Sequence, residues 1–277
     1  MKLRHRCPAF TILELLVAIA VLAMIVGLLA TAMSEASRLT VRGRKQMDLD
    51  SDARLVFDRI ASDIRRLVPG DDIDAGFVTD DSGNSRPAFF TRVRGVGGTS
   101  SSVRPVSLVG YRLFQAGARN VGSPPLQLQR AAVASEWTGS FLTFSETPDL
   151  RRADGVFAFS DPGAFQSLSE QILRFSIRFL VEEEDGSYRL QALPPDRIES
   201  IRAFVIGLAM LDLRSQEILT SDQILSVASA FSNPAEGADF LTAWNSILTA
   251  PTFPPHGVPA GATTGLRVYQ RTIPREL

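Results

Sequence analysis

The stretch that decides the fold runs from Pro8 to Val17 and reads Pro-Ala-Phe-Thr-Ile-Leu-Glu-Leu-Leu-Val. It opens a long apolar segment, because every residue from Leu15 to Ala30 is apolar or glycine. A helix needs about 20 residues to cross the core of a bilayer, so residues 10–32 are long enough to span it. A secretory signal peptide would have a shorter apolar region, whereas this segment continues without a polar break. We therefore expect a membrane helix here.

The residues before this segment predict its orientation. Lys2, Arg4 and Arg6 are basic, and no acidic residue accompanies them. Basic flanks of membrane segments tend to stay in the cytoplasm. We therefore expect a single-pass protein whose C-terminal part is extracytoplasmic.

Glu14 is the one charged residue inside the apolar segment. A charged side chain costs about 2.5–3.5 kcal/mol at the centre of a membrane helix, and less near its end. Such groups are rare and are usually paired with an opposite charge. A cut between Ala9 and Phe10 would create a new α-amino group four residues from Glu14. The natural partner of the Glu14 carboxylate would be a cation brought close in an assembly.

Residues 8–17 resemble the class III signal of type IV prepilins and of type II secretion pseudopilins. The resemblance implies that a prepilin peptidase cleaves between Ala9 and Phe10 and that the Phe10 amine is methylated. It also implies that Glu14 neutralises the Phe10 amine of a neighbouring subunit in a filament. The family usually has glycine where this chain has Ala9. The alternative is a plain signal anchor in which Glu14 merely lies at the membrane interface.

Beyond the membrane segment the chain keeps a helical rhythm. Apolar residues recur every three or four positions at Leu49, Ala53, Val56, Ile60, Ile64 and Leu67. Acidic and basic residues, Asp50, Asp52, Asp58 and Asp63 among them, alternate on the other faces, which is typical of a solvated helix surface. Pro69 and Gly70 then end the pattern. We expect residues 33–68 to continue the membrane helix as an amphipathic helix.

Strand patterns dominate residues 69–277, which we expect to form one extracytoplasmic domain. Alternating or short apolar runs predict strands at residues 107–115, 126–131, 141–144, 155–160, 173–181, 187–191 and 266–273. Asp185-Gly186 predicts a hairpin turn between two of them. Residues 71–102 read as loops with at most one strand around Ala88–Phe90.

The remaining apolar run, residues 198–213, predicts a buried central strand, and the alternative is a second membrane helix. Helices are expected at residues 215–231 and 238–248. The predicted fold class is α+β: a pilin-like long N-terminal helix packed on antiparallel sheets, with extra helices near the C-terminus and a leader at residues 1–9.

Chain length and three strands resemble the minor, J-type pseudopilins of type II secretion and the large prepilin-type cassette protein C family. The strands contain Val109-Gly110-Tyr111-Arg112-Leu113, residues 126–130 and residues 267–271. The resemblance implies a non-enzymatic minor subunit in the inner membrane, with a prepilin peptidase and other pilin or pseudopilin subunits as partners in a hetero-oligomer. The alternative is an extracytoplasmic binding or enzymatic domain that uses the helix only as an anchor.

Composition argues against most other functions. The 29 basic and 30 acidic residues nearly cancel, so no nucleic-acid partner is evident. Cys7 lies in the leader, and two histidines, His5 and His256, supply neither a zinc site nor a histidine triad. The sequence contains neither a G-x-S-x-G nucleophile motif nor a phosphate-binding G-x-x-x-x-G-K-[ST] motif, so we expect no catalytic site.

One acidic stretch offers oxygen ligands for calcium, which some pseudopilins bind. The candidate ligands are Asp72, Asp74, Asp80 and Asp81. Their spacing lacks the EF-hand pattern, and a solvated loop is the alternative. No other cofactor is expected.

Overall fold

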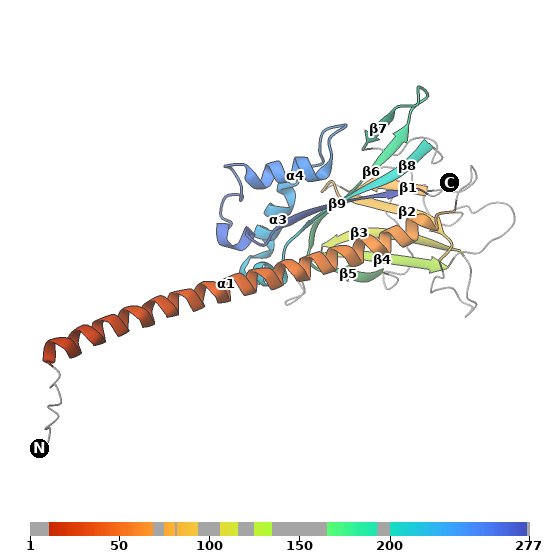
Figure 1. Cartoon of the computed structure of the whole chain (residues 1–277). Helices are drawn as coiled ribbons and strands as arrows, with labels where there is room; N and C mark the ends of the chain where they lie inside the picture. Colours follow the sequence, from red (N-terminus) through yellow and green to blue (C-terminus); the bar gives the residue numbers. More distant parts are fainter. Residues whose placement is uncertain are drawn as a thin grey trace, which may run out of the picture. The chain divides into compact units, whose positions relative to one another are not determined.

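A computed structural model (Figure 1) describes residues 11–68, 75–80, 82–93, 106–115, 125–134, 165–192 and 200–275. Its contacts divide the chain into two compact units, Met1–Met47 and Asp48–Leu277. Helix α1, Ile12–Arg65, contributes to both units. The predicted long helix is therefore confirmed over 54 residues, and it ends three residues earlier than expected. Beyond it, Leu67 forms an isolated bridge with Thr91.

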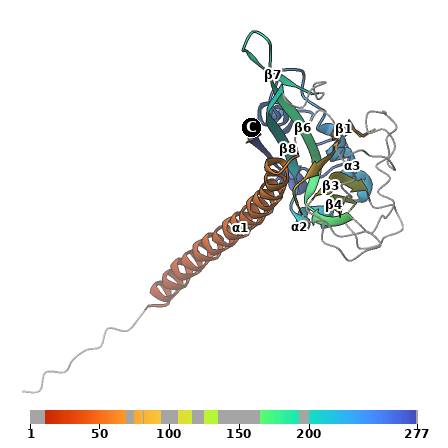
Figure 2. The same ribbon diagram turned by 90° about the vertical axis from the view of Figure 1, so that its right-hand side faces the viewer.

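The second unit contains two antiparallel sheets, as predicted. The five-stranded sheet has the order β1-β2-β3-β4-β5, with β1 Ala75–Thr79, β2 Ser85–Thr91, β3 Ser107–Gln115, β4 Leu126–Ala134 and β5 Phe165–Ser169. The four-stranded sheet has the order β7-β6-β8-β9, with β6 Ile172–Glu182, β7 Tyr188–Gln191, β8 Ile201–Met210 and β9 Arg267–Pro274. Figures 1 and 2 show both sheets beside the part of α1 that begins at Asp48.

The strongest local patterns predicted their elements well. Strand β3 has the predicted bounds, and β6 and β7 form the predicted hairpin, in which Glu182 faces Tyr188. Gly186 adopts a φ of 80°, which glycine tolerates best. Strand β8 lies between β6 and β9 and is buried along almost its whole length. The alternative of a second membrane helix at residues 198–213 is therefore wrong.

The single helix predicted at residues 215–231 is wrong, because the structure has two, α2 Leu213–Ile218 and α3 Ser221–Ala230. Thr220 causes the break by capping α3. Its hydroxyl accepts a hydrogen bond from the Gln223 amide, and the Gln223 side chain accepts one from the Thr220 amide. Helix α4, Phe240–Thr249, lies within two residues of its predicted bounds.

Two further differences concern strands. Residues 71–102 hold two strands, β1 and β2, where at most one was predicted. Strand β5 was not predicted at all. The strands expected at residues 141–144 and 155–160 lie outside the described residues.

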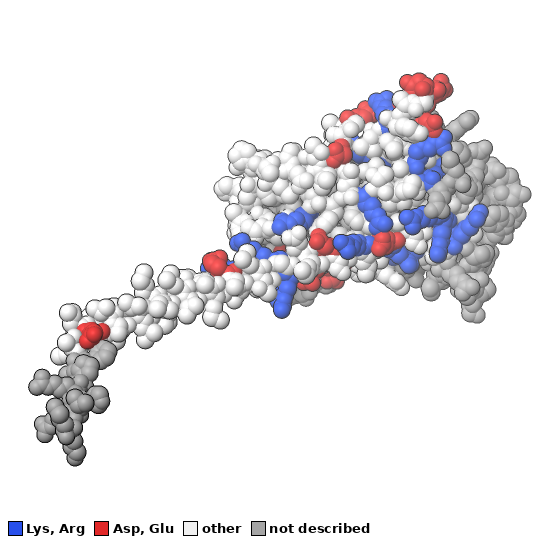
Figure 3. Space-filling model, in the orientation of Figure 1, with Lys and Arg blue, Asp and Glu red and all other residues white. Residues whose placement is uncertain are grey.

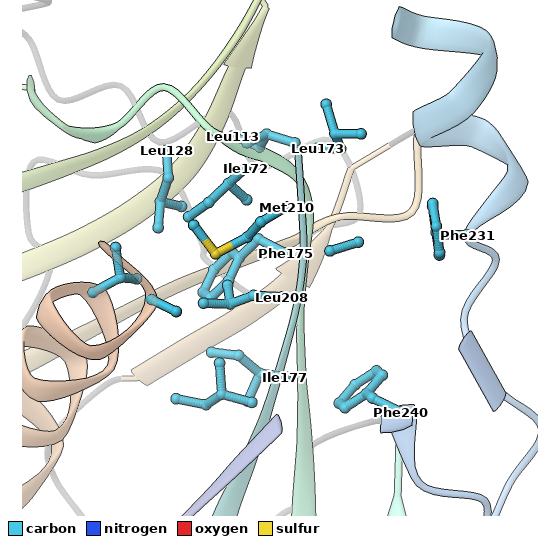
Figure 4. Packing of buried hydrophobic residues seen from close by; sticks show 14 of the residues in the cluster. Leu113, Leu128, Ile172, Leu173, Phe175, Ile177, Leu208, Met210, Phe231 and Phe240 are labelled. Atoms are coloured by element: carbon cyan, nitrogen blue, oxygen red, sulfur yellow. The ribbon is translucent and has the colours of Figure 1, made fainter. Parts of the chain in front are cut away.

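One hydrophobic core joins α1 to both sheets. Helix α1 contributes the predicted apolar stripe to this core. The stripe includes Leu49, Val56, Ile60 and Ile64, each 2% exposed or less. Figure 4 shows the strand side of this core, where Leu113 and Leu128 of the first sheet lie near residues of β6 and β8. The C-terminal part of α1 is thus an integral part of the folded domain.

Gly207 on β8 allows α4 to pack directly against the strand backbone. A Cβ atom at this position would lie 2.5 Å from Cγ of Phe240, whose side chain is fully buried. We predict that Gly207→Ala lowers the free energy of unfolding by about 1–3 kcal/mol, because overpacking forces Phe240 or the strand to shift.

Thermal denaturation of the detergent-solubilised chain, followed by circular dichroism, measures this loss. Gly261→Ala is the control, because a Cβ atom there meets nothing within 4 Å. Equal melting temperatures for the two variants would contradict the packing argument.

Candidate functional site

The first turn of α1 holds Glu14 in a capping box with Thr11. The Glu14 amide donates a hydrogen bond to the Thr11 hydroxyl at 3.2 Å, and the Thr11 amide donates one to Oε2 of Glu14 at 3.5 Å. These bonds satisfy two backbone N–H groups at the helix start, and the helix dipole favours a negative charge there. In the single chain, therefore, Glu14 already has a local partner.

This pairing was missed in the sequence, although the Thr-x-x-Glu spacing signals it. The predicted cleavage residues Ala9 and Phe10 lie outside the described residues. The structure therefore describes only one of the three N-terminal positions that the prediction names.

The helix that follows Glu14 is apolar on every side. The next charged residue is Glu35, and Figure 3 shows the uncharged stretch between them. Side chains on different faces are exposed alike, for example Leu16 at 62%, Leu22 at 61% and Leu28 at 61%. Within the described residues, α1 is the one helix that is long and apolar enough to cross a membrane. A helix that is apolar all round needs lipid or neighbouring helices as its surroundings.

Farther along α1, Asp63 forms a buried ion pair with the first sheet. Its side chain is 1% exposed, and Arg130 on β4 donates to both carboxylate oxygens at 2.6 and 3.0 Å. The Tyr111 hydroxyl on β3 donates a third hydrogen bond. This network fixes the helix against two neighbouring strands.

The environment keeps these groups in the protonation states that the network needs. Burial, together with Asp63, raises the pKa of Tyr111 well above its ordinary value, so the phenol stays protonated and can donate. Burial alone would lower the pKa of Arg130, but the hydrogen bonds and charges of Asp63 and Tyr111 outweigh it and raise that pKa.

Three further acidic residues of α1 also contact the sheets. Asp50 accepts a hydrogen bond from the Tyr269 hydroxyl at 2.7 Å, Asp58 pairs with Arg271 at 2.6 Å, and Asp52 accepts from Ser169 and Gln171. Burial raises the pKa of Asp52 despite these two hydrogen bonds. The prediction of a solvated face is therefore wrong for the buried Asp63 and for the half-buried Asp50 and Asp52, whereas Asp58 is 68% exposed and lies on a solvated face.

A sequence signal existed for one of the four acids. Asp63 lies three residues after Ile60 and seven after Val56, and therefore on the apolar stripe. The contacts of the other three depend on strands that are more than 100 residues away, such as the Asp50–Tyr269 pair with its separation of 219 residues.

The calcium hypothesis is testable here at only one position. The Asp80 carboxylate accepts a hydrogen bond from the Asn84 amide at 2.8 Å and lies 3.9 Å from Nε of Arg86. Asp80 therefore belongs to the β1–β2 turn. The other three candidate ligands, Asp72, Asp74 and Asp81, lie outside the described residues, and within those residues no three His, Cys, Asp or Glu side chains gather as a metal site would require. Calcium binding stays a prediction.

The described chain thus combines a capped glutamate, a helix that is apolar on all sides and antiparallel sheets packed on the end of that helix. Residues 4–30 match the family model described as the prokaryotic N-terminal methylation motif. The match includes Ala9, Phe10 and Glu14. The chain thus carries this motif at its N-terminus, and the motif implies processing by a prepilin peptidase.

Among solved structures, the chain is similar to a type IV-like pilin from Thermus thermophilus. The two share 14% sequence identity over 82% of this chain and 92% of that chain, with a TM-score of 0.33. At these values the match supports no inference about this chain. No curated protein matches the sequence.

Proposed function

We propose that the chain is a non-enzymatic minor pilin or pseudopilin, assembled into a type IV pilus-like or type II secretion pseudopilus filament. The observation that carries this proposal is the methylation motif at residues 4–30, with Glu14 in the first turn of a helix that is apolar on all sides beyond it. An anchor alone would need the apolar helix but no carboxylate at that position. The size and strands that resemble J-type pseudopilins and the cassette protein C family support a minor subunit.

In this proposal each N-terminal segment has its own role. Residues 1–9 are the leader that prepilin peptidase removes, and residues 10–32 cross the inner membrane. Residues 33–68 continue the helix into an extracytoplasmic domain at residues 69–277. The new amine of Phe10 becomes methylated.

Assembly would exchange the partner of Glu14. In the single chain its carboxylate accepts a long hydrogen bond, of 3.5 Å, from the Thr11 amide. The charged amine of a neighbouring Phe10 would make a charge-assisted hydrogen bond, which is about twice as strong as a neutral one. Surroundings of low dielectric constant strengthen this attraction further. The exchange therefore favours stacked helices in a fixed register.

The first test is the N-terminus of the membrane-extracted protein. After co-expression with its native prepilin peptidase, we expect intact mass and N-terminal sequencing to give a chain that starts at N-methylated Phe10. With an inactive peptidase, the chain should start at Met1.

Ala9→Gly is the matched variant, because it restores the residue that the family usually has before the cut. It should be processed at least as completely as the parent chain. A parent chain that still starts at Met1 beside active peptidase would favour a plain anchor. A cut beyond Ala32 would make the apolar segment a disposable signal and overturn the proposal.

A further inference from the structure

An open groove of about 810 Å³ lies on the second unit, between α1 and β5. Its lining includes Arg54, Leu55 and Arg59 from the exposed side of α1, and Gln166 and Leu168 from β5. In the described part of the chain, β5 is the last strand of its sheet. The groove thus combines a helix face with the end of a sheet.

The groove carries positive charge that the described residues do not neutralise. Of its other charged groups, Arg130 is paired with Asp63 and Asp58 is paired with Arg271. Arg54 and Arg59 are exposed, and neither makes a hydrogen bond or an ion pair within the residues that the structure describes. The groove therefore favours an anionic occupant.

An apolar side chain separates the two free arginines. At 100° per residue, Leu55 falls between Arg54 and Arg59 on the helical projection. Its side chain is 57% exposed, and the partly buried Leu168 also lines the groove. The occupant should thus offer a large apolar group together with its carboxylates.

The tip of the β6–β7 hairpin has this chemistry. It reads Glu-Glu-Glu-Asp-Gly-Ser-Tyr from Glu182 to Tyr188, and Figure 3 shows acidic side chains gathered at its end. Glu184 makes no hydrogen bond or ion pair with any described residue, and Asp185 bonds only within the turn, to the Ser187 amide at 2.8 Å. Tyr188 is 61% exposed. In Figures 1 and 2 the tip projects away from the part of α1 that begins at Asp48, so it is placed to reach another molecule.

We propose that the hairpin tip of one copy of this chain docks in the α1–β5 groove of the next copy. Glu184 and Asp185 pair with Arg54 and Arg59, and the Tyr188 ring packs on Leu55. Arginine suits carboxylates because it can bind them through two parallel hydrogen bonds. Tyrosine is among the residues that contribute most to protein interfaces.

Because the contact joins two different surfaces, two copies can meet head to tail, which leaves one groove and one tip free for a further contact. It rests on the proposed function and deepens it by naming a contact outside the membrane. The tip alone is smaller than a standard interface. It acts together with helix packing, because subunits held in one membrane meet at high effective concentration.

Disulfide cross-linking between two differently tagged full-length chains tests this contact in membranes. One chain carries Leu55→Cys and the other Tyr188→Cys, which leaves all four charged groups in place, and Cys7→Ser in both chains removes the native thiol. Oxidation should give a mixed-tag dimer. Asp222→Cys, at an exposed acid on α3, replaces Tyr188→Cys as the control and should give none.

Charge reversal adds a second measurement. Arg59→Glu in the groove chain should lower the dimer yield about fivefold, the ratio that corresponds to about 1 kcal/mol, and Glu184→Arg in the tip chain should restore it. The docking is overturned if the mixed-tag dimer yield is no higher than the yield with Asp222→Cys. It is also overturned if the yield stays the same with Arg59→Glu and with Glu184→Arg. The N-terminus of the same samples is sequenced, so loss of docking in chains that start at Phe10 is distinguished from failure of the proposed function.

Discussion

Asp63→Ala is expected to lower the free energy of unfolding by about 3–5 kcal/mol, which is the usual cost of breaking a buried ion pair. The variant leaves the buried Arg130 guanidinium without its counter-ion and the Tyr111 hydroxyl without its acceptor. Desolvation of the stranded charge is the main cost, and the lost hydrogen bonds add to it. Urea unfolding of the detergent-solubilised chain, followed by tryptophan fluorescence, to which the buried Trp244 contributes, measures the loss.

Asp58→Ala is the matched control, because it removes another aspartate of α1 that is bonded to an arginine of a strand. The Asp58 side chain is 68% exposed, so its loss should cost less than about 1 kcal/mol. Replacing both buried partners, as in Asp63→Leu with Arg130→Met, should recover part of the stability, because no charge is then stranded. Equal losses for Asp63→Ala and Asp58→Ala would contradict the role of burial.

Glu14→Ala is expected to prevent assembly while the chain still enters the membrane. A hydrogen bond to a charged group contributes about 1.5–3 kcal/mol, so its loss should reduce association about 10- to 100-fold. The measurement is co-purification of native pilin-like subunits from detergent-extracted membranes. The apolar helix itself is unchanged, so carbonate-resistant membrane insertion should be equal to that of the parent chain.

Thr11→Val separates the two roles of Glu14. It removes the hydroxyl that caps the helix but keeps the carboxylate, so co-purification should fall much less than with Glu14→Ala. Equal losses would mean that Glu14 acts only as a cap. No loss in either variant would favour the alternative in which the helix is merely an anchor for a binding or enzymatic domain.

The elements that could be predicted are those whose signal is local. Strand β3 alternates over nine residues, and β8 is a long apolar run, so each was located from its own residues. Strand β5, Phe165–Ser169, has one buried residue and three small or amide residues, and this gives no clear periodicity. It is a strand because β4 pairs with it. Local chemistry could have separated α2 from α3, since Thr220 and Gln223 carry the capping-box spacing.

The candidate site divides in the same way. The N-terminal motif and the apolar helix are continuous in sequence and were predicted from it. The acidic contacts of α1 were not, because a helix pattern cannot distinguish an aspartate that faces water from one that faces a distant arginine. Asp63 and Arg130 are 67 residues apart, so only the folded sheet shows that they are paired.

The position of α1 in the core affects how the protein is made. The stripe of α1 leaves the ribosome early, but Tyr269, which bonds to Asp50, follows 219 residues later. At about 5–20 residues per second, translation needs roughly 10–45 s to supply that last strand. During this interval the apolar stripe has no finished sheet to cover it, while the membrane segment ahead of it has already been translated. Early insertion of that segment would hold each nascent chain at the bilayer, apart from other unfinished copies. The chain would stay there until the last strand is translated and the domain can complete its fold.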